Sequence, residues 1–194
     1  AHSAQQLGQS ITTQHTGRRT APDLSGLVRR RPASDTGARC NGGDGWQHED
    51  YIDVDHRSLP MRPALAQGVP VTVSVETRTG TISARVWQLA IGRNTLLLLD
   101  SNVEGNQPED RELTSRLYGG DDRVRIRQEL LLGVGGVKAL TALGIAPGVV
   151  HLNEGHSVFA TLEAIRERMH NDGQSFDNAL REVAQHTVFT THTP

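Results

Sequence analysis

The chain has 194 residues, enough for one ordinary domain with a hydrophobic core and too few for two large domains. Its formal net charge of -2, with 22% charged residues, argues against nucleic acid or an anionic membrane surface as a partner. No apolar run is long enough to span a bilayer, the first residues show no signal segment, and the single Cys40 cannot form an internal disulfide. We therefore expect a soluble, cytoplasmic protein.

We expect the first segment, residues 1–43, to be a loop or disordered. Residues 9–41 are rich in Thr, Gly, Ser, Pro and Arg, and their apolar residues show no period. The run Arg-Arg-Arg-Pro at 29–32 would interrupt either a helix or a central strand. Residues 44–51 then begin a more ordered stretch, with a turn followed by an amphipathic polar segment.

Two alternating segments, 69–76 and 81–89, predict a β-hairpin with its turn at Thr79 and Gly80. The favoured interpretation is an antiparallel platform that packs against the main sheet. Residues 96–99 follow as a fully apolar strand that stops at the polar residues 100–102.

Two helices are predicted next, a short one over 108–118 and a longer one over 123–143 that ends at Gly144. The longer helix contains Gly133, Gly135 and Gly136, each of which costs about 0.5 to 1 kcal/mol relative to alanine. Such a cost is usually offset by close approach of another group. Tight packing of the helix against the sheet is favoured over direct ligand contact.

The C-terminal part predicts a βαβ unit, with strands over 149–152 and 187–190 and helices over 155–170 and 175–185. Together with the preceding elements this indicates an α/β fold, one half of a doubly wound sheet. In open α/β sheets, ligands bind beyond the carboxyl ends of the strands. Polar residues directly after both strands are therefore the first candidates for chemistry.

The candidate cluster after the first of these strands is His151, Glu154 and His156. Its spacing matches no zinc motif and straddles a strand end, so no metal is assigned. Two interpretations stay open. In one, Asn153 caps the following helix and the histidines only make local hydrogen bonds. In the other, the carboxylate and imidazoles bind sugar hydroxyls through charge-assisted hydrogen bonds.

Four ordered motifs resemble the α-glucan (glycogen, starch and maltodextrin) phosphorylase family in its shorter bacterial form. They are LYGGD at 117–121, RIRQELLLGVGGV at 125–137, HLNEGHS at 151–157 and FTTHTP at 189–194. The resemblance runs from about residue 44 to residue 194. It implies a partial N-terminal α/β domain, part of a Rossmann-like domain of the two-domain GT-B glycosyltransferase architecture. Residues 9–41 do not match the family. We interpret them as either a local reading-frame artefact or an unusual insertion.

The resemblance also implies roles for residues. His192 matches the histidine that lies against the transferred glucosyl unit and is the catalytic candidate. Asn153, Glu154 and His156 match a second strand end on the sugar side and are substrate-binding candidates.

Residues 118–122 match a mobile gate loop at the mouth of the active site, and we call them the gate segment. Asp121 and Asp122 are its acidic positions and further substrate-binding candidates. Gly119 and Gly120 would supply the freedom that such a loop needs to move.

The reaction implied by the resemblance is phosphorolysis of an α-1,4-glucan by inorganic phosphate to glucose 1-phosphate, with retention of configuration. The family uses pyridoxal phosphate, bound by a lysine of a C-terminal domain that this chain lacks, and the full-length enzyme would be a homodimer. The only lysine here, Lys138, lies outside any cofactor motif, so we assign no cofactor-binding residue and expect the chain alone to be inactive. Two alternatives remain, a nucleotide-sugar glycosyltransferase of the same architecture and a glucan-binding relic.

Overall fold

The computed structural model describes residues 9–14, 59–115 and 121–191. The strands in these ranges are β1 (Gln9–Gln14), β2 (Arg62–Pro63), β3 (Leu65–Ala66), β4 (Val69–Pro70), β5 (Thr72–Thr77), β6 (Gly80–Ile91), β7 (Asn94–Asp100), β8 (Val150–Asn153) and β9 (Thr187–Thr190). The helices are α1 (Pro108–Arg111), α2 (Asp122–Leu130), the π-helical turn η3 (Leu131–Gly135), α3 (Gly136–Ala142), the 3-10 turn η4 (Gly155–Ser157), α4 (Phe159–Asn171) and α5 (Phe176–Gln185). None of these helices is long and apolar enough to cross a membrane.

The larger sheet has five strands. Four of them lie in the order β1-β7-β6-β2, and the fifth, β5, also pairs with β6, on the same edge as β2. Every pair in this sheet is antiparallel. The predicted hairpin is confirmed as β5 and β6, which pair from Thr72 opposite Arg85 to Thr77 opposite Gly80. The predicted apolar strand is confirmed as β7. It belongs to the same sheet as the hairpin, because β6 is long enough to pair with β7 as well, from Arg85 opposite Asp100 to Ile91 opposite Asn94.

The loop predicted for residues 9–41 is wrong at its start. Gln9–Gln14 form β1, which runs antiparallel to β7 with Gln9 opposite Leu99 and Gln14 opposite Asn94. Three of its residues are β-branched, and its backbone satisfies the hydrogen-bonding groups that β7 would otherwise leave open at the sheet edge. The rest of segments 1–43 and 44–51 lies outside the described residues.

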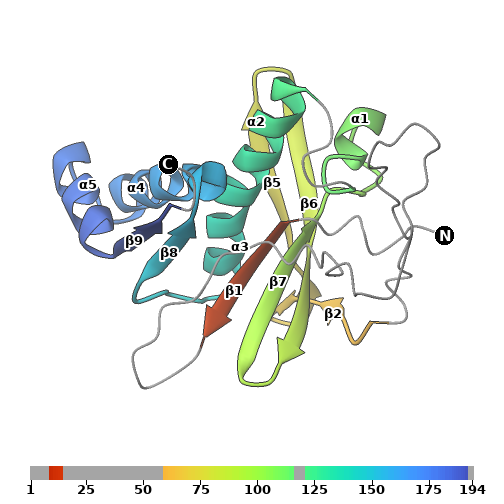
Figure 1. The fold of residues 1–194 in the computed structure, drawn as a ribbon, viewed down its shortest axis with the longest axis horizontal. Coiled ribbons are helices and arrows are strands. Elements are labelled where there is room, and N and C mark those ends of the chain that lie inside the picture. The colour runs from red at the N-terminus through yellow and green to blue at the C-terminus, as the bar shows by residue number, and fades with distance from the viewer. Residues whose placement is uncertain (1–8, 15–58, 116–120, 192–194) are drawn as a thin grey trace, which may run out of the picture.

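One long helical segment, α2-η3-α3, crosses the five-stranded sheet (Figure 1) and confirms the predicted long helix. It covers a core whose buried residues include Val73, Val75, Ile82, Ala84, Val86, Leu97, Leu99, Leu131 and Ala139. The unpredicted feature is the π-helical turn, which coincides with Gly133 and Gly135.

The two glycines of this turn make room for different neighbours. A methyl group on Gly135 would lie 3.5 Å from side-chain atoms of both Leu99 and Val75, so this glycine packs on the sheet as predicted. A methyl group on Gly133 would lie 2.6 Å from the backbone nitrogen of Ala160 and 2.7 Å from Cβ of Phe159, both in α4. The π-helical turn is therefore packed between the sheet and α4.

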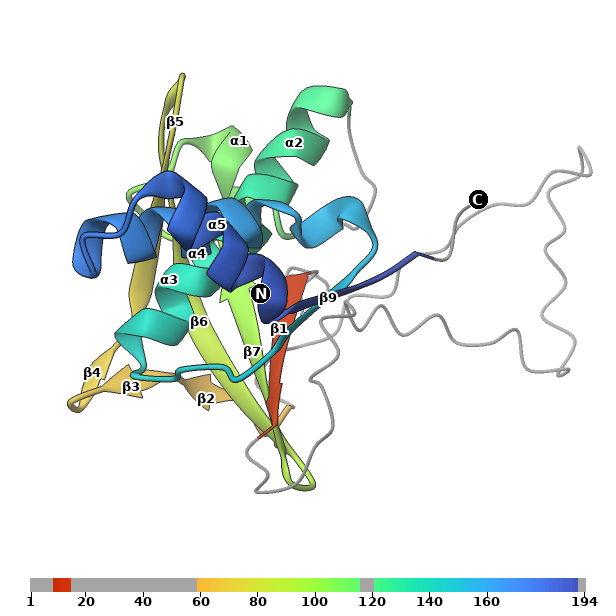
Figure 2. The ribbon, with the colours of Figure 1, turned by 90° about the vertical axis from the view of Figure 1, so that its left-hand side faces the viewer.

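The C-terminal βαβ unit is confirmed. Strands β8 and β9 pair in parallel, and α4 and α5 connect them, with a second small core formed by Ile165, Ala179 and Val183. Ser175 caps α5 as predicted, since its Oγ accepts from the N–H of Asn178 at 3.4 Å. In Figure 2, viewed from the side of this unit, α3, α4 and α5 lie in front of β6 and β7.

The fold is thus mixed α/β, as predicted, but the described residues do not form one doubly wound sheet. β8 and β9 pair only with each other among these residues, and the antiparallel strands form a separate sheet. The predicted α1 is also shorter than 108–118. It ends at Arg111, and the chain then turns so that the hydroxyl of buried Thr114 meets Ser101 at 3.1 Å.

The connecting helix α4 carries a buried carboxylate, Glu163, which accepts two hydrogen bonds of 2.8 Å from Arg166. Because these bonds favour the charged guanidinium, they raise the pKa of Arg166 above its ordinary value. An arginine is charged across the accessible pH range in either case, so the raised pKa of Arg166 does not change the charge of this side chain below strongly alkaline conditions.

Candidate functional site

The carboxyl ends of β8 and β9 lie side by side. The parallel register places Asn153 opposite Thr190, and the N–H of Glu154 donates to the carbonyl oxygen of Thr190 at 2.8 Å. The prediction that both strands present polar residues at one sheet edge is therefore confirmed as far as Thr190. His192 lies two residues further on, outside the described part of the chain.

Glu154 has an unusual backbone conformation, with φ 63° and ψ -177°. This region is populated almost only by glycine, and a residue with a side chain pays about 1–3 kcal/mol to occupy it. Such strain persists where surrounding structure holds it, often at binding sites. Glu154 is therefore held in place by its surroundings and not by its own conformational preference.

The interpretation in which Asn153 caps the next helix is not supported. The residue at the N-cap position of η4 is Glu154, and its side chain makes no capping hydrogen bond. The longer helix α4 begins after Val158, whose side chain cannot cap it. Asn153 and Glu154 therefore sit on the strand-end turn itself.

His156 lies on η4 and faces α2. Its Nδ1 is 3.6 Å from Oε1 of Glu129, and that carboxylate also accepts from Nε of Arg125 at 3.2 Å. The side chains of His156 and Glu129 are 35% and 18% exposed, so the contact is partly shielded from water. Sequence reasoning missed Glu129, because its spacing from Arg125 signals only a helix-surface ion pair.

His151 has a structural contact. Its Nε2 lies 2.6 Å from the hydroxyl of Thr190, which joins the middle of β8 to the end of β9. Within residues 9–14, 59–115 and 121–191, no group of three or more His, Cys, Asp or Glu side chains could hold a metal ion.

The acidic residues of the gate segment lie apart from the strand-end turn. Asp121 is the N-cap of α2 and accepts from the N–H groups of Arg123 and Val124 at 3.1 and 3.0 Å. Asp122 is the exposed first residue of α2, roughly 10 Å along the helix axis from Glu129, at 1.5 Å per residue. The structure thus does not bring Asp121 and Asp122 into the cluster of Asn153, Glu154 and His156.

The lysine of the chain does not fit a pyridoxal phosphate site. Lys138 lies on α3, where its Nζ donates to the carbonyl oxygen of Ser74 on β5 at 2.8 Å. It points to the five-stranded sheet, away from the strand ends that carry Glu154. We derive no chemistry through this cofactor from the residues of this chain.

The parallel strand ends, with the strained backbone of Glu154 and the partly shielded imidazole of His156, define an α/β protein with a polar strand-end turn. Comparison with known proteins identifies the family that shares this chain's sequence. Glycogen phosphorylase of Mycobacterium tuberculosis is 47% identical over 158 residues, which make up 78% of this chain and 18% of that enzyme. Maltodextrin phosphorylase of Thermococcus litoralis is 40% identical over 152 residues, with the same two shares.

A third relative, glycogen phosphorylase of Aquifex aeolicus, is 38% identical over 152 residues, 78% of this chain and 22% of the enzyme. No protein-family model matches the chain. The resemblance to the α-glucan phosphorylases is confirmed, and the chain is homologous to part of these enzymes. It spans only 18 to 22% of the length of these curated relatives.

Proposed function

We propose that this chain is part of an α-1,4-glucan phosphorylase, which releases glucose 1-phosphate from a glucan with inorganic phosphate and with retention of configuration. The observation that carries the proposal is the 47% identity to a glycogen phosphorylase over 158 residues. The names of the relatives do not favour the alternatives, a nucleotide-sugar glycosyltransferase or a glucan-binding relic. The parent enzyme would be cytoplasmic, dimeric and of the GT-B architecture, with residues 44–194 in its N-terminal domain.

In this proposal the strand-end turn binds the hydroxyl groups of a glucosyl unit. A carboxylate such as Glu154 accepts from two neighbouring hydroxyls, and Asn153 and His156 add a donor or an acceptor each. The strained backbone of Glu154 supports this role, because it fixes the carboxylate direction before the sugar arrives. His192, two residues beyond Thr190, is the group proposed to touch the transferred glucosyl unit.

The gate segment has a different role in the proposal. The capping bonds of Asp121 hold the start of α2, and the neighbouring Asp122 is exposed to solvent. Both would border the path of the glucan at the mouth of the site. The pyridoxal phosphate lysine and the groups that bind inorganic phosphate would come from the part of the parent enzyme outside this chain.

A chimera tests the proposal. The matching segment of Mycobacterium tuberculosis glycogen phosphorylase is replaced by this chain, and formation of glucose 1-phosphate from glycogen and phosphate is measured. We expect the chimera to be active. Glu154→Ala should lower its kcat/KM at least about tenfold, since a hydrogen bond to a charged group contributes about 1.5–3 kcal/mol.

Glu104→Ala, at an exposed turn after β7, is the matched control and should leave activity unchanged. A chimera that folds and shows the absorbance of bound pyridoxal phosphate, yet produces no glucose 1-phosphate, would contradict the proposal. The separate 194-residue chain should produce none under the same conditions.

A further inference from the structure

A cavity of about 460 Å³ lies between α3, the connection that leads to β8, and the two helices of the βαβ unit. It reaches the amino ends of β8 and β9, where Val150 and Thr187 line it, and its lining does not include Asn153, Glu154 or His156. The cavity is therefore separate from the strand-end turn. Its volume is in the range of small-molecule sites, which are about 300–1,000 Å³.

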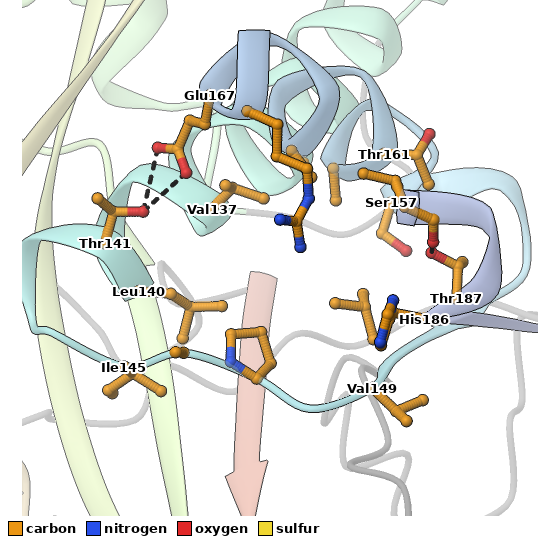
Figure 3. A pocket seen from close by; sticks show the side chains of 18 of the residues that line it. Val137, Leu140, Thr141, Ile145, Val149, Ser157, Thr161, Glu167, His186 and Thr187 are labelled. Carbon is orange, nitrogen blue, oxygen red and sulfur yellow. Dashed lines mark hydrogen bonds between the residues drawn. The ribbon is translucent and has the colours of Figure 1, made fainter. Parts of the chain in front are cut away.

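The cavity wall is mostly apolar. Figure 3 shows Leu140 and Ile145 on one side of it, and Ser157 and His186 on the other. Further apolar lining comes from Leu132, Val149, Ala160 and Val183. A glucan, which carries hydroxyls around the edge of every ring, would leave most of them without partners against this wall.

One polar group in the wall is unsatisfied. Ser157 is 1% exposed, and its Oγ has no hydrogen-bond partner in the described part of the chain. A buried hydroxyl without a partner costs about 1–3 kcal/mol, and such groups in native structures call for an explanation. Ser157 lines the cavity, so rotation about its χ1 would turn the hydroxyl toward a ligand there, which can then supply the missing partner.

The charged groups around the cavity already have partners. Arg168 is paired with Glu182 at 2.6 Å and lies 4.0 Å from Asp172. The carboxylate of Glu167 accepts from the hydroxyl of Thr141, with both oxygens 3.0 Å away. Since these ionic groups are engaged, the site is suited to a neutral ligand.

We propose that this cavity binds a neutral, largely apolar molecule of about two fused rings that carries one hydroxyl group, and that this hydroxyl hydrogen bonds to Ser157. The site is independent of the glucan site proposed above. Its occupant would contact His151 and Ser157, which flank the strand-end turn on both sides in the chain.

The experiment uses the 194-residue chain and two probes of equal shape, 2-naphthol and naphthalene, with binding followed by amide chemical shifts. We expect saturable binding of 2-naphthol with shifts at Ser157 and His186, about tenfold tighter than binding of naphthalene. Ser157→Ala should reduce this difference to less than about twofold and leave naphthalene binding unchanged. Ser74→Ala, at an exposed position of β5, should preserve the full difference.

A second variant, Ala146→Trp, fills the cavity from an exposed loop position and should abolish binding of both probes. Ser157→Ala should fold at least as stably as the natural chain, because it removes an unsatisfied group, so a loss of 2-naphthol binding will not reflect unfolding. Absence of saturable binding to the natural chain would overturn the proposal, and so would an unchanged preference for 2-naphthol in Ser157→Ala. Neither result depends on glucan binding or phosphorolysis.

Discussion

Glu154 donates its backbone N–H to the carbonyl oxygen of Thr190 at 2.8 Å, one residue beyond the last paired position of β8 and β9. The hydrogen-bond ladder thus extends onto the residue that has a φ of 63°. Because the neighbouring strand holds this backbone, its strain is maintained by the βαβ unit and not by the turn alone. The geometry of the proposed sugar site therefore depends on the pairing of β8 with β9.

Replacing Glu154 by glycine should separate stability from binding. Glycine adopts the observed φ and ψ without the strain of about 1–3 kcal/mol, although it loses about 0.5–1 kcal/mol through the greater entropy of the unfolded chain. We expect Glu154→Gly to raise the free energy of unfolding by about 1 kcal/mol in urea denaturation. Binding of maltoheptaose, measured by calorimetry, should weaken at the same time.

The control for this prediction is Glu112→Gly. Glu112 is exposed and has an ordinary φ of -90°, so glycine has no strain to relieve there. The free energy of unfolding should fall by about 0.5–1 kcal/mol. A loss of stability in Glu154→Gly equal to that in the control would show that Glu154 is not strained.

Gly133 should be far less tolerant of substitution than Gly135. A Cβ on Gly133 meets the backbone of α4 at 2.6 Å, and backbone cannot move aside as a side chain can, so Gly133→Ala should cost more than about 3 kcal/mol. For Gly135→Ala the closest contact is the flexible Leu131 side chain at 3.3 Å, and the higher helix propensity of alanine offsets it by about 1 kcal/mol. Thermal denaturation followed by circular dichroism gives both values, and equal losses would show that α4 does not pack on η3 in this way.

The parts of the fold that could be predicted are those specified by local patterns. Strands β5 and β6 alternate apolar and polar residues, and Ser175 and Gly173 mark the boundary between α4 and α5 within a few residues. The strand β1 could not be predicted, because its partner β7 lies far away in the chain and its own sequence has little apolar periodicity.

The candidate site shows the same division. The position of Asn153, Glu154 and His156 at the end of β8 could be predicted, because polar residues follow a short apolar strand there, whereas their role in binding stays a prediction. The positive φ of Glu154 had no local signal, since glutamate rarely adopts it. The contact between His156 and Glu129 depends on how α2 packs beside η4, and sequence spacing does not report tertiary packing.

Two substitutions of Asp121 should show whether this residue of the gate segment acts through its negative charge or by capping α2. Asp121→Ala removes the two hydrogen bonds to α2 and should lower the free energy of unfolding by about 1 kcal/mol. Asp121→Asn keeps a good capping group without the charge, so its stability should stay close to that of the natural chain. If the carboxylate also binds glucan, calorimetry will show weaker maltoheptaose binding in Asp121→Asn, whereas unchanged binding would limit Asp121 to its structural role.

The ion pair between Asp110 and Arg127 should stabilise the chain on either side of residues 116–120. Nη2 of Arg127 donates to Oδ1 of Asp110, and the two side chains are 22% and 7% exposed. Asp110→Asn removes the compensating charge, and leaving a buried partner unpaired costs about 3–5 kcal/mol; the partial exposure of Arg127 reduces this to about 2 kcal/mol.

The double variant Asp110→Asn/Arg127→Met tests the origin of that cost. Methionine replaces the cation with an apolar chain of similar length, so the double variant should regain much of the stability lost in Asp110→Asn. Urea denaturation of both single variants and of the double variant gives the coupling energy. Additive losses would mean that the two side chains do not interact. The segments α1 and α2 would then be held together by the buried Leu113 side chain and by the hydrogen bond from Nε2 of Gln128 to the carbonyl oxygen of Leu113 at 2.7 Å.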